Sequence, residues 1–514
     1  MVSGHTSLSS EAVYLFNGFP FLAPEGRNWL LSHIDRENFP FSVSQWKPFQ
    51  RTRSDEAPCA SVESPYQLHR DVCLPPLLTV RQYIASYFSH GLCLALPVID
   101  PSRFETTVSK AYATGRVTNT AELQAKICVL SFLCLQSLFQ SSSDAKDLVI
   151  DGECISATVK SLISIVCQDM TLESLQICVM MSIYYFFTGD LHEASIWNAL
   201  AIRINSFLDS NDYNLAEPTN QNRDTWLSPG TTTKVSGVLF WISYALDKEL
   251  CLQTGRPSFI NDDHYDLSLS FEYLKDFHMK ESDFTMPQVV SHGTLLFYDL
   301  RLALIKSQIY DELYSARAKA KTDALILEDI NSLIDTLEQW RVSFPPLLRP
   351  YPRIDTVETI CANIEMRSIM IQLAYFDCVS VTYEANCRCR ASPSQFLKVE
   401  EIGPSLNLAV EASRSSLRYL IAVRHSLVAR YFWLLIFFPL RALSTVLLNI
   451  LLHPCSSQTF EDVKLLKVAT GFVRSLMCEH KSRSRGARMN SLDKYMEDLG
   501  RIMEYVTKKL LQKE

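Results

Sequence analysis

Closely spaced glycines are what this 514-residue sequence most clearly lacks. The nearest pair among its 15 glycines is Gly230 and Gly237, which are seven residues apart. A Walker loop, a dinucleotide-binding Gly-x-Gly-x-x-Gly turn and a Gly-x-Ser-x-Gly nucleophile elbow all require glycines at shorter spacing. The sequence therefore excludes the entry motifs of three large classes of enzyme.

An excess of positive charge is also missing. The chain has 49 basic and 56 acidic residues, a formal net charge of −7. A protein that wraps nucleic acid neutralises many phosphates with basic side chains, so any DNA contact here must be local. The densest basic run is His480–Arg488, which fits an import signal or a phosphate contact and fits a solvated interhelical loop equally well.

Metal-binding patterns are scarce. The 11 histidines contain no His-Glu-x-x-His motif, and Cys387 and Cys389 lack both the spacing and the second cysteine pair of a zinc cluster. The 15 cysteines are an odd number, and many lie in apolar stretches, as Cys128 and Cys134 do. No secretory leader precedes them, so we expect buried, reduced thiols in an intracellular protein without a metal or cofactor.

Apolar residues recur with a helical period along most of the chain. Hydrophobic residues make up 47% of the sequence and charged residues 20%, which is enough apolar surface for a folded core. Asp100 followed by Pro101 is a typical helix start. We expect one helix between Pro76 and Gly91, one that begins at Pro101, and others near 122–140, 146–168, 172–187, 192–208, 235–253, 290–317, 324–341, 357–384, 404–424, 427–452, 460–478 and 490–511. Alternating strand-like segments are not expected, so the prediction is an all-α fold, a large helical array or bundle.

Proline positions suggest the domain boundaries. Seven of the first 75 residues are proline, which predicts an irregular N-terminal arm with short helices over 1–75. A second break, Phe344-Pro-Pro-Leu-Leu-Arg-Pro350, divides the remaining helices. We therefore expect a helical regulatory domain over 76–345 and a C-terminal helical half over 346–514 packed on it.

One apolar run, Tyr431–Leu452, is long enough to cross a bilayer of about 30 Å as a helix. Arg441 lies at its centre, and Pro439 and Asn449 are also unfavourable in lipid. We interpret the run as a buried central helix of a large α-domain, with a membrane span as the alternative.

A second alternative concerns the acidic residues Asp262, Asp263 and Asp266, whose Asp-Asp-x-x-Asp spacing is similar to the magnesium site of class I terpene cyclases. The downstream ligand set of such an enzyme is not found. The preferred interpretation is a solvated acidic loop whose carboxylates cap a helix or pair with Arg256.

The block Phe240–Asp266 resembles the signature of the fungal-specific transcription factor domain, the middle homology region of fungal zinc-cluster regulators. That signature contains a Phe-Trp pair, an Asp-Arg pair, a Gly-Arg-Pro turn and a pair of acids. The corresponding residues here are Phe240, Trp241, Asp247, Gly255, Arg256, Pro257, Asp262 and Asp263. Further matching segments lie at Tyr87–Phe104, Thr188–Arg203, Leu337–Pro346 and Phe438–Leu452, so the resemblance covers roughly 76–480.

The resemblance implies an all-α transcription regulator in the nucleus, with no enzymatic activity, of the kind that controls a fungal metabolite gene cluster. The signature residues are expected to form a packing and ion-pair node, structural before functional. The family's N-terminal six-cysteine zinc cluster, which places a helix in the major groove, has no counterpart, because only Cys59 and Cys73 precede residue 90. The basic run before the Phe-Trp pair is replaced by Thr231–Gly237.

These two departures make direct DNA binding doubtful. The expected partners are therefore proteins of the transcription machinery or a zinc-cluster regulator, a small-molecule effector, and a second copy of the chain in a homodimer. No membrane partner is expected. An alternative is that the zinc cluster is encoded upstream of Met1. The alternative in another class is the all-α, metal-dependent enzyme using Asp262, Asp263 and Asp266.

Overall fold

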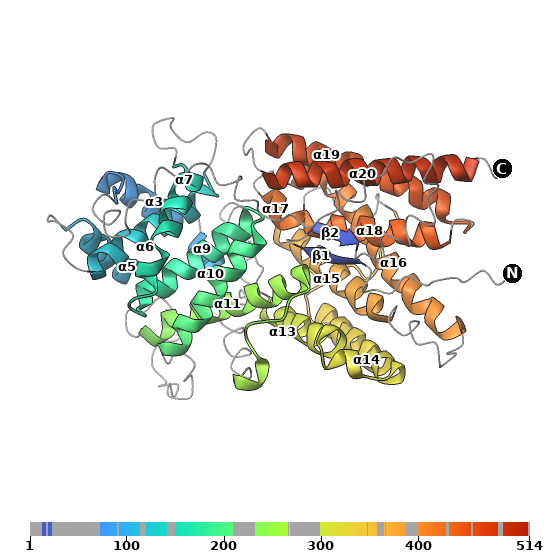
Figure 1. Cartoon of the computed structure of the whole chain (residues 1–514), viewed down its shortest axis with the longest axis horizontal. Helices are drawn as coiled ribbons and strands as arrows, with labels where there is room; N and C mark the ends of the chain where they lie inside the picture. Colours follow the sequence, from blue (N-terminus) through green and yellow to red (C-terminus); the bar gives the residue numbers. More distant parts are fainter. Residues whose placement is uncertain are drawn as a thin grey trace. The chain divides into compact units, whose positions relative to one another are not determined.

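A computed structural model of the chain describes 13–16, 19–22, 72–89, 92–113, 120–140, 150–208, 232–265, 267, 299–346, 348–356, 364, 366–386, 399–427, 431–453, 456–481 and 487–511. Within these ranges the chain is helical apart from one β-hairpin (Figure 1). The predicted all-α class is confirmed.

The contacts between residues divide the chain into two compact units. The N-terminal unit comprises Glu56–Lys248 and Ser258–Leu300, and the C-terminal unit comprises Met1–Asp55, Glu249–Pro257 and Arg301–Glu514. This division by contacts differs from the division by sequence into 1–75, 76–345 and 346–514, which stays a prediction about domains.

The N-terminal unit is built around two helices that are buried along nearly their whole length, α6 and α9. Their apolar residues continue round every face, as expected for core helices. Helix α10 lies against α9 after a tight turn at Gly189, where φ is +76°. The helices of this unit are α3 Leu77–Ser89, α4 Leu92–Ala95, α5 Pro101–Ala111, α6 Thr120–Ser137, α7 Gly152–Ser161, α8 Ile163–Val166, α9 Leu172–Phe187, α10 Leu191–Phe207, most of α11 Thr232–Thr254 and the short 3₁₀-helix η6 Asp262–His264.

Side-chain caps fix several of these helix starts. Asp100 accepts a hydrogen bond from the backbone N–H of Arg103 at 3.0 Å, which confirms the predicted start of α5. The helix expected over 146–168 is wrong in its bounds, because Asp151 caps a helix that begins at Gly152 and ends at Ser161. A larger residue at Gly152 would require Ser137 to move, since an added Cβ would lie 2.1 Å from its hydroxyl oxygen and 3.0 Å from its Cβ.

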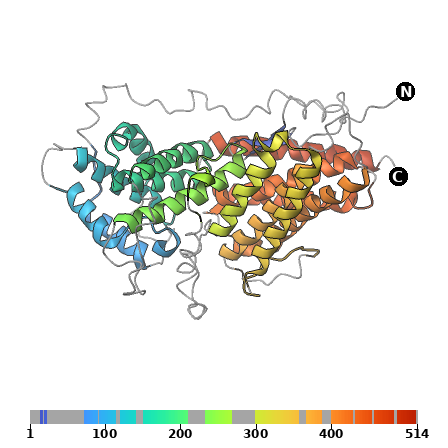
Figure 2. The ribbon, with the colours of Figure 1, turned by 90° about the horizontal axis from the view of Figure 1, so that it is seen from below.

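The C-terminal unit packs α15, α16 and α18 at its centre. Helix α14 lies against α15, and α19 lies against both α18 and α20; Figure 2 shows α14 and α15 side by side. The elements of this unit are α13 Leu300–Ile309, the π-helix η8 Tyr310–Tyr314, the 3₁₀-helix η9 Ala318–Ala320, α14 Asp323–Val342, α15 Met366–Glu384, α16 Val399–Ala422, the 3₁₀-helix η12 Arg424–Ser426, α17 Phe432–Leu435, α18 Phe437–Leu452, α19 Thr459–Lys481 and α20 Ala487–Leu511.

A β-hairpin occupies part of the segment that was expected to be irregular with short helices. Strands β1 Val13–Phe16 and β2 Phe19–Leu22 pair antiparallel, with Val13 opposite Leu22 and Phe16 opposite Phe19. The expectation that strand-like segments are absent is therefore wrong here. Both strands are rich in aromatic and apolar residues, and the sequence between them is Asn-Gly, the dipeptide that most favours a two-residue hairpin turn.

The apolar run Tyr431–Leu452 is divided into α17 and α18 by a break at Ile436. Pro439 lies in the first turn of α18, where its missing N–H and its ring are tolerated, whereas in the middle of one long helix they would disrupt it. In the described part of the chain, Phe432–Leu451 alone is long and apolar enough to span a membrane, and 67% of its most apolar window is buried. That burial favours the core interpretation.

Five cysteines, Cys128, Cys134, Cys178, Cys251 and Cys378, are buried and free, as expected. Burial raises the pKa of the Cys128, Cys134 and Cys178 thiols, which keeps them protonated. Cys73, Cys154, Cys167 and Cys478 are exposed, and Cys93 is half-buried. Cys387 and Cys389, and the centre of the basic run at 482–486, lie outside the described residues.

Candidate functional site

The signature residues of the resemblance lie on the second half of α11 and on the loop that follows it. Phe240 and Trp241 are buried, with exposed fractions of 2% and 3%, and their rings meet edge to face at 5.2 Å. Trp241 also packs against Tyr244 at 5.5 Å, and Phe240 against Tyr265 from the loop at 5.1 Å. These aromatic contacts within the N-terminal unit confirm that Trp241 is a core residue.

Asp247 holds the returning loop. Its carboxylate is buried and accepts hydrogen bonds from the backbone N–H groups of Phe259 at 3.1 Å and Ile260 at 3.0 Å, and from the hydroxyl of Ser258. Burial raises the pKa of Asp247, although these three hydrogen bonds act in the opposite direction. The side chain therefore substitutes for a backbone partner and fixes the path of 258–260.

Lys248 is the residue that the sequence reasoning missed. Its side chain is only 1% exposed, and Nζ donates to the Ser258 hydroxyl at 2.8 Å and the Ile260 carbonyl at 2.7 Å. The same nitrogen lies 2.8 Å from Oδ1 of Asp262 and 4.9 Å from the centre of the Tyr244 ring. The family signature has an Asp-Arg pair at this position, and its counterpart here is Asp247-Lys248. The basic member of that pair is the sequence feature that points to Lys248.

The two acids of the signature have different environments. Asp262 is partly buried and accepts a hydrogen bond from the Tyr244 hydroxyl at 3.1 Å in addition to its ion pair with Lys248. Asp263 is exposed at the 3₁₀-helix η6, where Asn261 accepts from its backbone N–H at 3.1 Å. The cap is thus provided by Asn261, while the predicted capping role of the carboxylates is not seen at this turn.

Gly255 and its neighbours form the end of α11. Gly255 has a φ of +67°, and its N–H donates to the Cys251 carbonyl at 2.9 Å. This is a left-handed C-terminal cap, which favours glycine because other residues are strained there. Arg256 and Pro257 are exposed, and the backbone N–H of Arg256 donates to the Thr254 hydroxyl at 3.3 Å.

The magnesium-site alternative gains no support from this geometry. Among the described residues, no group of three histidine, cysteine or acidic side chains could hold a metal ion. Asp262 is already paired with a buried lysine, and Asp266 lies outside the described residues. A lysine at 2.8 Å occupies the position that a cation bound to Asp262 would need.

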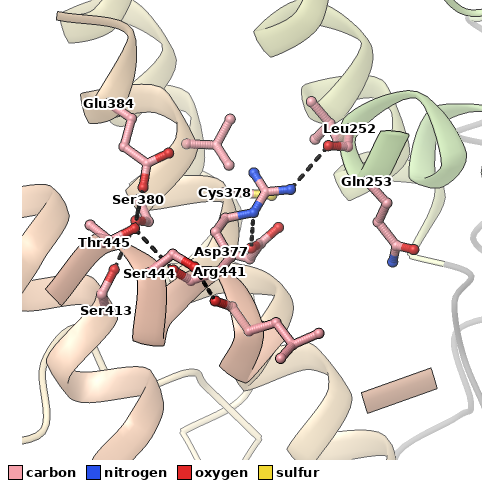
Figure 3. Close-up of polar contacts among 12 residues, drawn as sticks. Leu252, Gln253, Asp377, Cys378, Ser380, Glu384, Ser413, Arg441, Ser444 and Thr445 are labelled. Atoms are coloured by element: carbon pink, nitrogen blue, oxygen red, sulfur yellow. Dashed lines mark hydrogen bonds and ion pairs between the residues drawn. The ribbon is translucent and has the colours of Figure 1, made fainter. Parts of the chain in front are cut away.

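A second polar cluster, in the C-terminal unit, surrounds Arg441 (Figure 3). Arg441 Nε lies 3.1 Å from Oδ1 of Asp377 on α15, and one Nη donates to the carbonyl of Leu252 in the last turn of α11 at 3.0 Å. The charged residue at the centre of the apolar run thus has a carboxylate and a helix C-terminal carbonyl as partners within the protein.

The fungal specific transcription factor domain matches residues 84–342, which is just over half of the 514-residue chain. The chain therefore belongs to the fungal specific transcription factor domain family. The match contains the whole of α11 and the loop to η6, so the aromatic, Asp247 and Lys248 contacts lie inside the family domain. The part of the resemblance beyond 342 stays a prediction.

Three curated relatives are transcription factors by name. The chain is 30% identical over 259 residues to an ABC-transporter-regulating transcription factor of Aspergillus oryzae and 28% identical over 257 residues to one of Aspergillus fumigatus. Each match covers 48% of this chain and 28% of the relative. The Fusaridione A cluster transcription factor fsdR of Fusarium heterosporum is 32% identical over 129 residues, 25% of this chain and 23% of the relative.

The chain thus matches less than a third of the length of these relatives. No solved structure matches it.

Proposed function

We propose that this protein is a transcription regulator that acts in the nucleus and has no enzymatic activity. The observation that carries the proposal is the family match over 84–342, whose signature block forms a packing node held by the hydrogen bonds of Asp247 and Lys248. Such a node provides a rigid scaffold, with Arg256, Pro257 and Phe259 on the outside of the loop. In this proposal the chain works through protein partners, a small-molecule effector, or a homodimer.

The gene class under its control is a narrower proposal. Control of a metabolite gene cluster is supported by the name of the Fusarium heterosporum relative. The names of the two Aspergillus relatives support an alternative class of target, ABC-transporter genes. Both classes can be followed in one experiment, in which transcript levels are measured after induced expression of the chain in a fungal host.

A tethering assay tests regulatory output without depending on DNA recognition by the chain itself. The 514-residue chain is fused to a heterologous DNA-binding domain, and transcription of a reporter with the matching operator is measured. We expect a change in reporter output relative to the DNA-binding domain alone. A fusion that accumulates in the nucleus and leaves the reporter unchanged contradicts the proposal.

The matched control uses two variants of one loop. Asp247→Ala removes the acceptor of three hydrogen bonds, so it should lower both the folded protein and the reporter output. Phe259→Ala changes an aromatic side chain that is 57% exposed and should leave the fold intact. A loss of output with Phe259→Ala at normal protein level would identify this exposed residue as a partner contact.

A further inference from the structure

The C-terminal unit contains a buried cluster of charged side chains that the family signature does not account for. Its members come from four helices: Glu249 on α11, Lys306 on α13, Asp377 and Glu384 on α15, and Arg441 on α18. Glu249 and Lys306 are 8% and 7% exposed, and the side chains of Arg441 and Asp377 are 13% and 9% exposed. Glu384 is partly exposed. Three carboxylates therefore share two cations, and the four other members have little access to water.

The pairing within the cluster is uneven. Lys306 Nζ forms a close ion pair with Glu249. Arg441 Nε is 3.1 Å from Asp377 Oδ1 but does not have the angle of a hydrogen bond. Glu384 instead accepts hydrogen bonds from two hydroxyls, those of Ser380 at 3.0 Å and Thr445 at 2.7 Å (Figure 3). Asp377 is thus the carboxylate held by an ion pair that lacks hydrogen-bond geometry.

An uncompensated negative charge in a buried site is costly, and the usual way to remove it is to take up a proton. Burial raises the pKa of Asp377 to about 6, Arg441 and Lys306 oppose this change, and Glu249 and Glu384 add to it. At Lys306, burial lowers the pKa, but Glu249, Cys378 and Asp377 together outweigh burial, so the net pKa is raised and the amine keeps its charge. The proton therefore goes to Asp377.

Arg441 links this proton to the backbone of α11. Besides facing Asp377, Arg441 donates to the Leu252 carbonyl at 3.0 Å, one of the last-turn carbonyls that have no partner within a helix. Tyr314 of η8 and Cys378 of α15 complete the titratable groups around the guanidinium. The position of one side chain thus depends both on a titrating acid and on the end of a helix.

We propose that this cluster is a one-proton switch, in which protonation of Asp377 makes the cluster neutral and frees Arg441 to turn from Leu252 toward Glu384. The last turn of α11 then loses a hydrogen-bond donor and opens more readily. In the ionised state, Arg441 spans Asp377 and the Leu252 carbonyl and holds that turn closed.

The effect on stability has a definite sign. The ordinary pKa of an aspartate is 3.8, and that of Asp377 in the folded protein is about 6. Between these values the folded protein binds the proton and the unfolded chain does not, so the contribution of this group to stability falls as the pH rises through the window. Asp377 is thus mostly protonated at about pH 5 and mostly ionised at about pH 7.

Infrared spectroscopy of the full chain measures the proton directly. The carbonyl band of a buried protonated carboxylic acid is followed in difference spectra from about pH 4.5 to about pH 8. In the wild-type chain we expect a band of Asp377 with a midpoint near pH 6, in addition to any band of Asp247, whose pKa is also raised by burial. In Asp377→Asn this band should disappear, and in Asp329→Asn, which removes a carboxylate from a separate ion pair with Lys321, it should remain. A midpoint below about pH 5 in the wild type would overturn the proposal.

A second variant keeps the test decisive where Asp377→Asn does not fold. Glu384→Gln removes a negative charge that raises the pKa of Asp377, so the midpoint should move to lower pH. An unchanged midpoint in Glu384→Gln contradicts the shared-charge cluster.

Hydrogen exchange then tests the link to α11. Exchange of the peptide covering 249–255 is compared at about pH 5 and about pH 7, after correction for the intrinsic rate. The wild-type peptide should be several-fold less protected at the lower pH, and the Asp377→Asn peptide should be equally unprotected at both. Equal protection at both pH values in the wild type would show that protonation of Asp377 does not affect the last turn of α11, and would contradict the proposal.

Discussion

Nζ of Lys248 lies 2.8 Å from Oδ1 of Asp262, so an ion pair joins a fully buried residue of α11 to the acidic turn 14 positions further along the chain. The same amine donates to the Ile260 carbonyl at 2.7 Å, while the adjacent Asp247 accepts from the Ile260 N–H at 3.0 Å. Two consecutive charged side chains thus hold both backbone groups of one residue. The pair gives the acidic residue of the signature turn a structural partner within the protein.

Replacing Lys248 by methionine keeps the length of the side chain and removes the charge. Asp262 would lose its ion pair and the Ile260 carbonyl its donor, so we expect the free energy of unfolding to fall by about 3 kcal/mol. Urea denaturation of the two proteins measures this difference. The control is Arg81→Met, whose ion pair with Glu105 at 2.7 Å is about half exposed on both sides and should cost less than about 1 kcal/mol. Equal losses in the two variants would contradict the central role of Lys248.

Replacing Trp241 by alanine should lower the free energy of unfolding by about 3 to 5 kcal/mol, because a buried indole is lost and a cavity is left. Its ring contacts with Phe240 and Tyr244 would be lost as well. Phe259→Ala is the matched aromatic control, since that side chain is 57% exposed and its loss should change stability by no more than about 0.5 kcal/mol. A Trp241→Ala protein with an unchanged midpoint of denaturation and reduced partner binding would identify Trp241 as a contact residue instead.

Much of the helical fold could be predicted from short-range patterns. Helix α9 begins and ends where its apolar run predicts, and Asp100 with Pro101 marks the start of α5 correctly, because caps and amphipathic periods are local properties. The hairpin β1–β2 could have been predicted as well, since Asn17-Gly18 lies between two apolar runs.

The polar contacts at the site could not be predicted in the same way. Arg256 lies close to the acidic loop in sequence, whereas the structure pairs Asp262 with Lys248 on the preceding helix. The pairing of the other loop carboxylates with Arg256 stays a prediction. The path of the loop back along the helix decides which charged side chains come close enough to pair. The hydrophobic periodicity of the sequence carries no information on this path. Asp377 and Arg441, 64 positions apart, are a stronger case of the same kind.

The expressed chain should remain in solution without detergent, because the run Tyr431–Leu452 is a core segment. Arg441 is paired with Asp377 and Leu252 inside the C-terminal unit, and a charged residue at the centre of a bilayer costs roughly 2.5 to 3.5 kcal/mol on insertion scales. We therefore expect the expressed chain in the supernatant after high-speed centrifugation of a lysate. Recovery only in a membrane pellet that resists high salt and carbonate would show that the run spans a bilayer.

DNA binding by the 514-residue chain should be weak and without sequence preference at physiological salt. A protein that neutralises several phosphates shows log K falling with log salt at about −0.9 per phosphate contact, and specific readers add bidentate contacts to base edges. The net charge of the chain is −7, and its densest basic run, Lys481–Arg488, holds four basic residues. At low salt we therefore expect a slope no steeper than about −3 to −4.

Anisotropy titrations against a library of genomic fragments measure both the affinity and its salt dependence, with a purified zinc-cluster DNA-binding protein as the positive control. Submicromolar, sequence-selective binding by the chain alone would contradict the proposal that it reaches its target genes through partners.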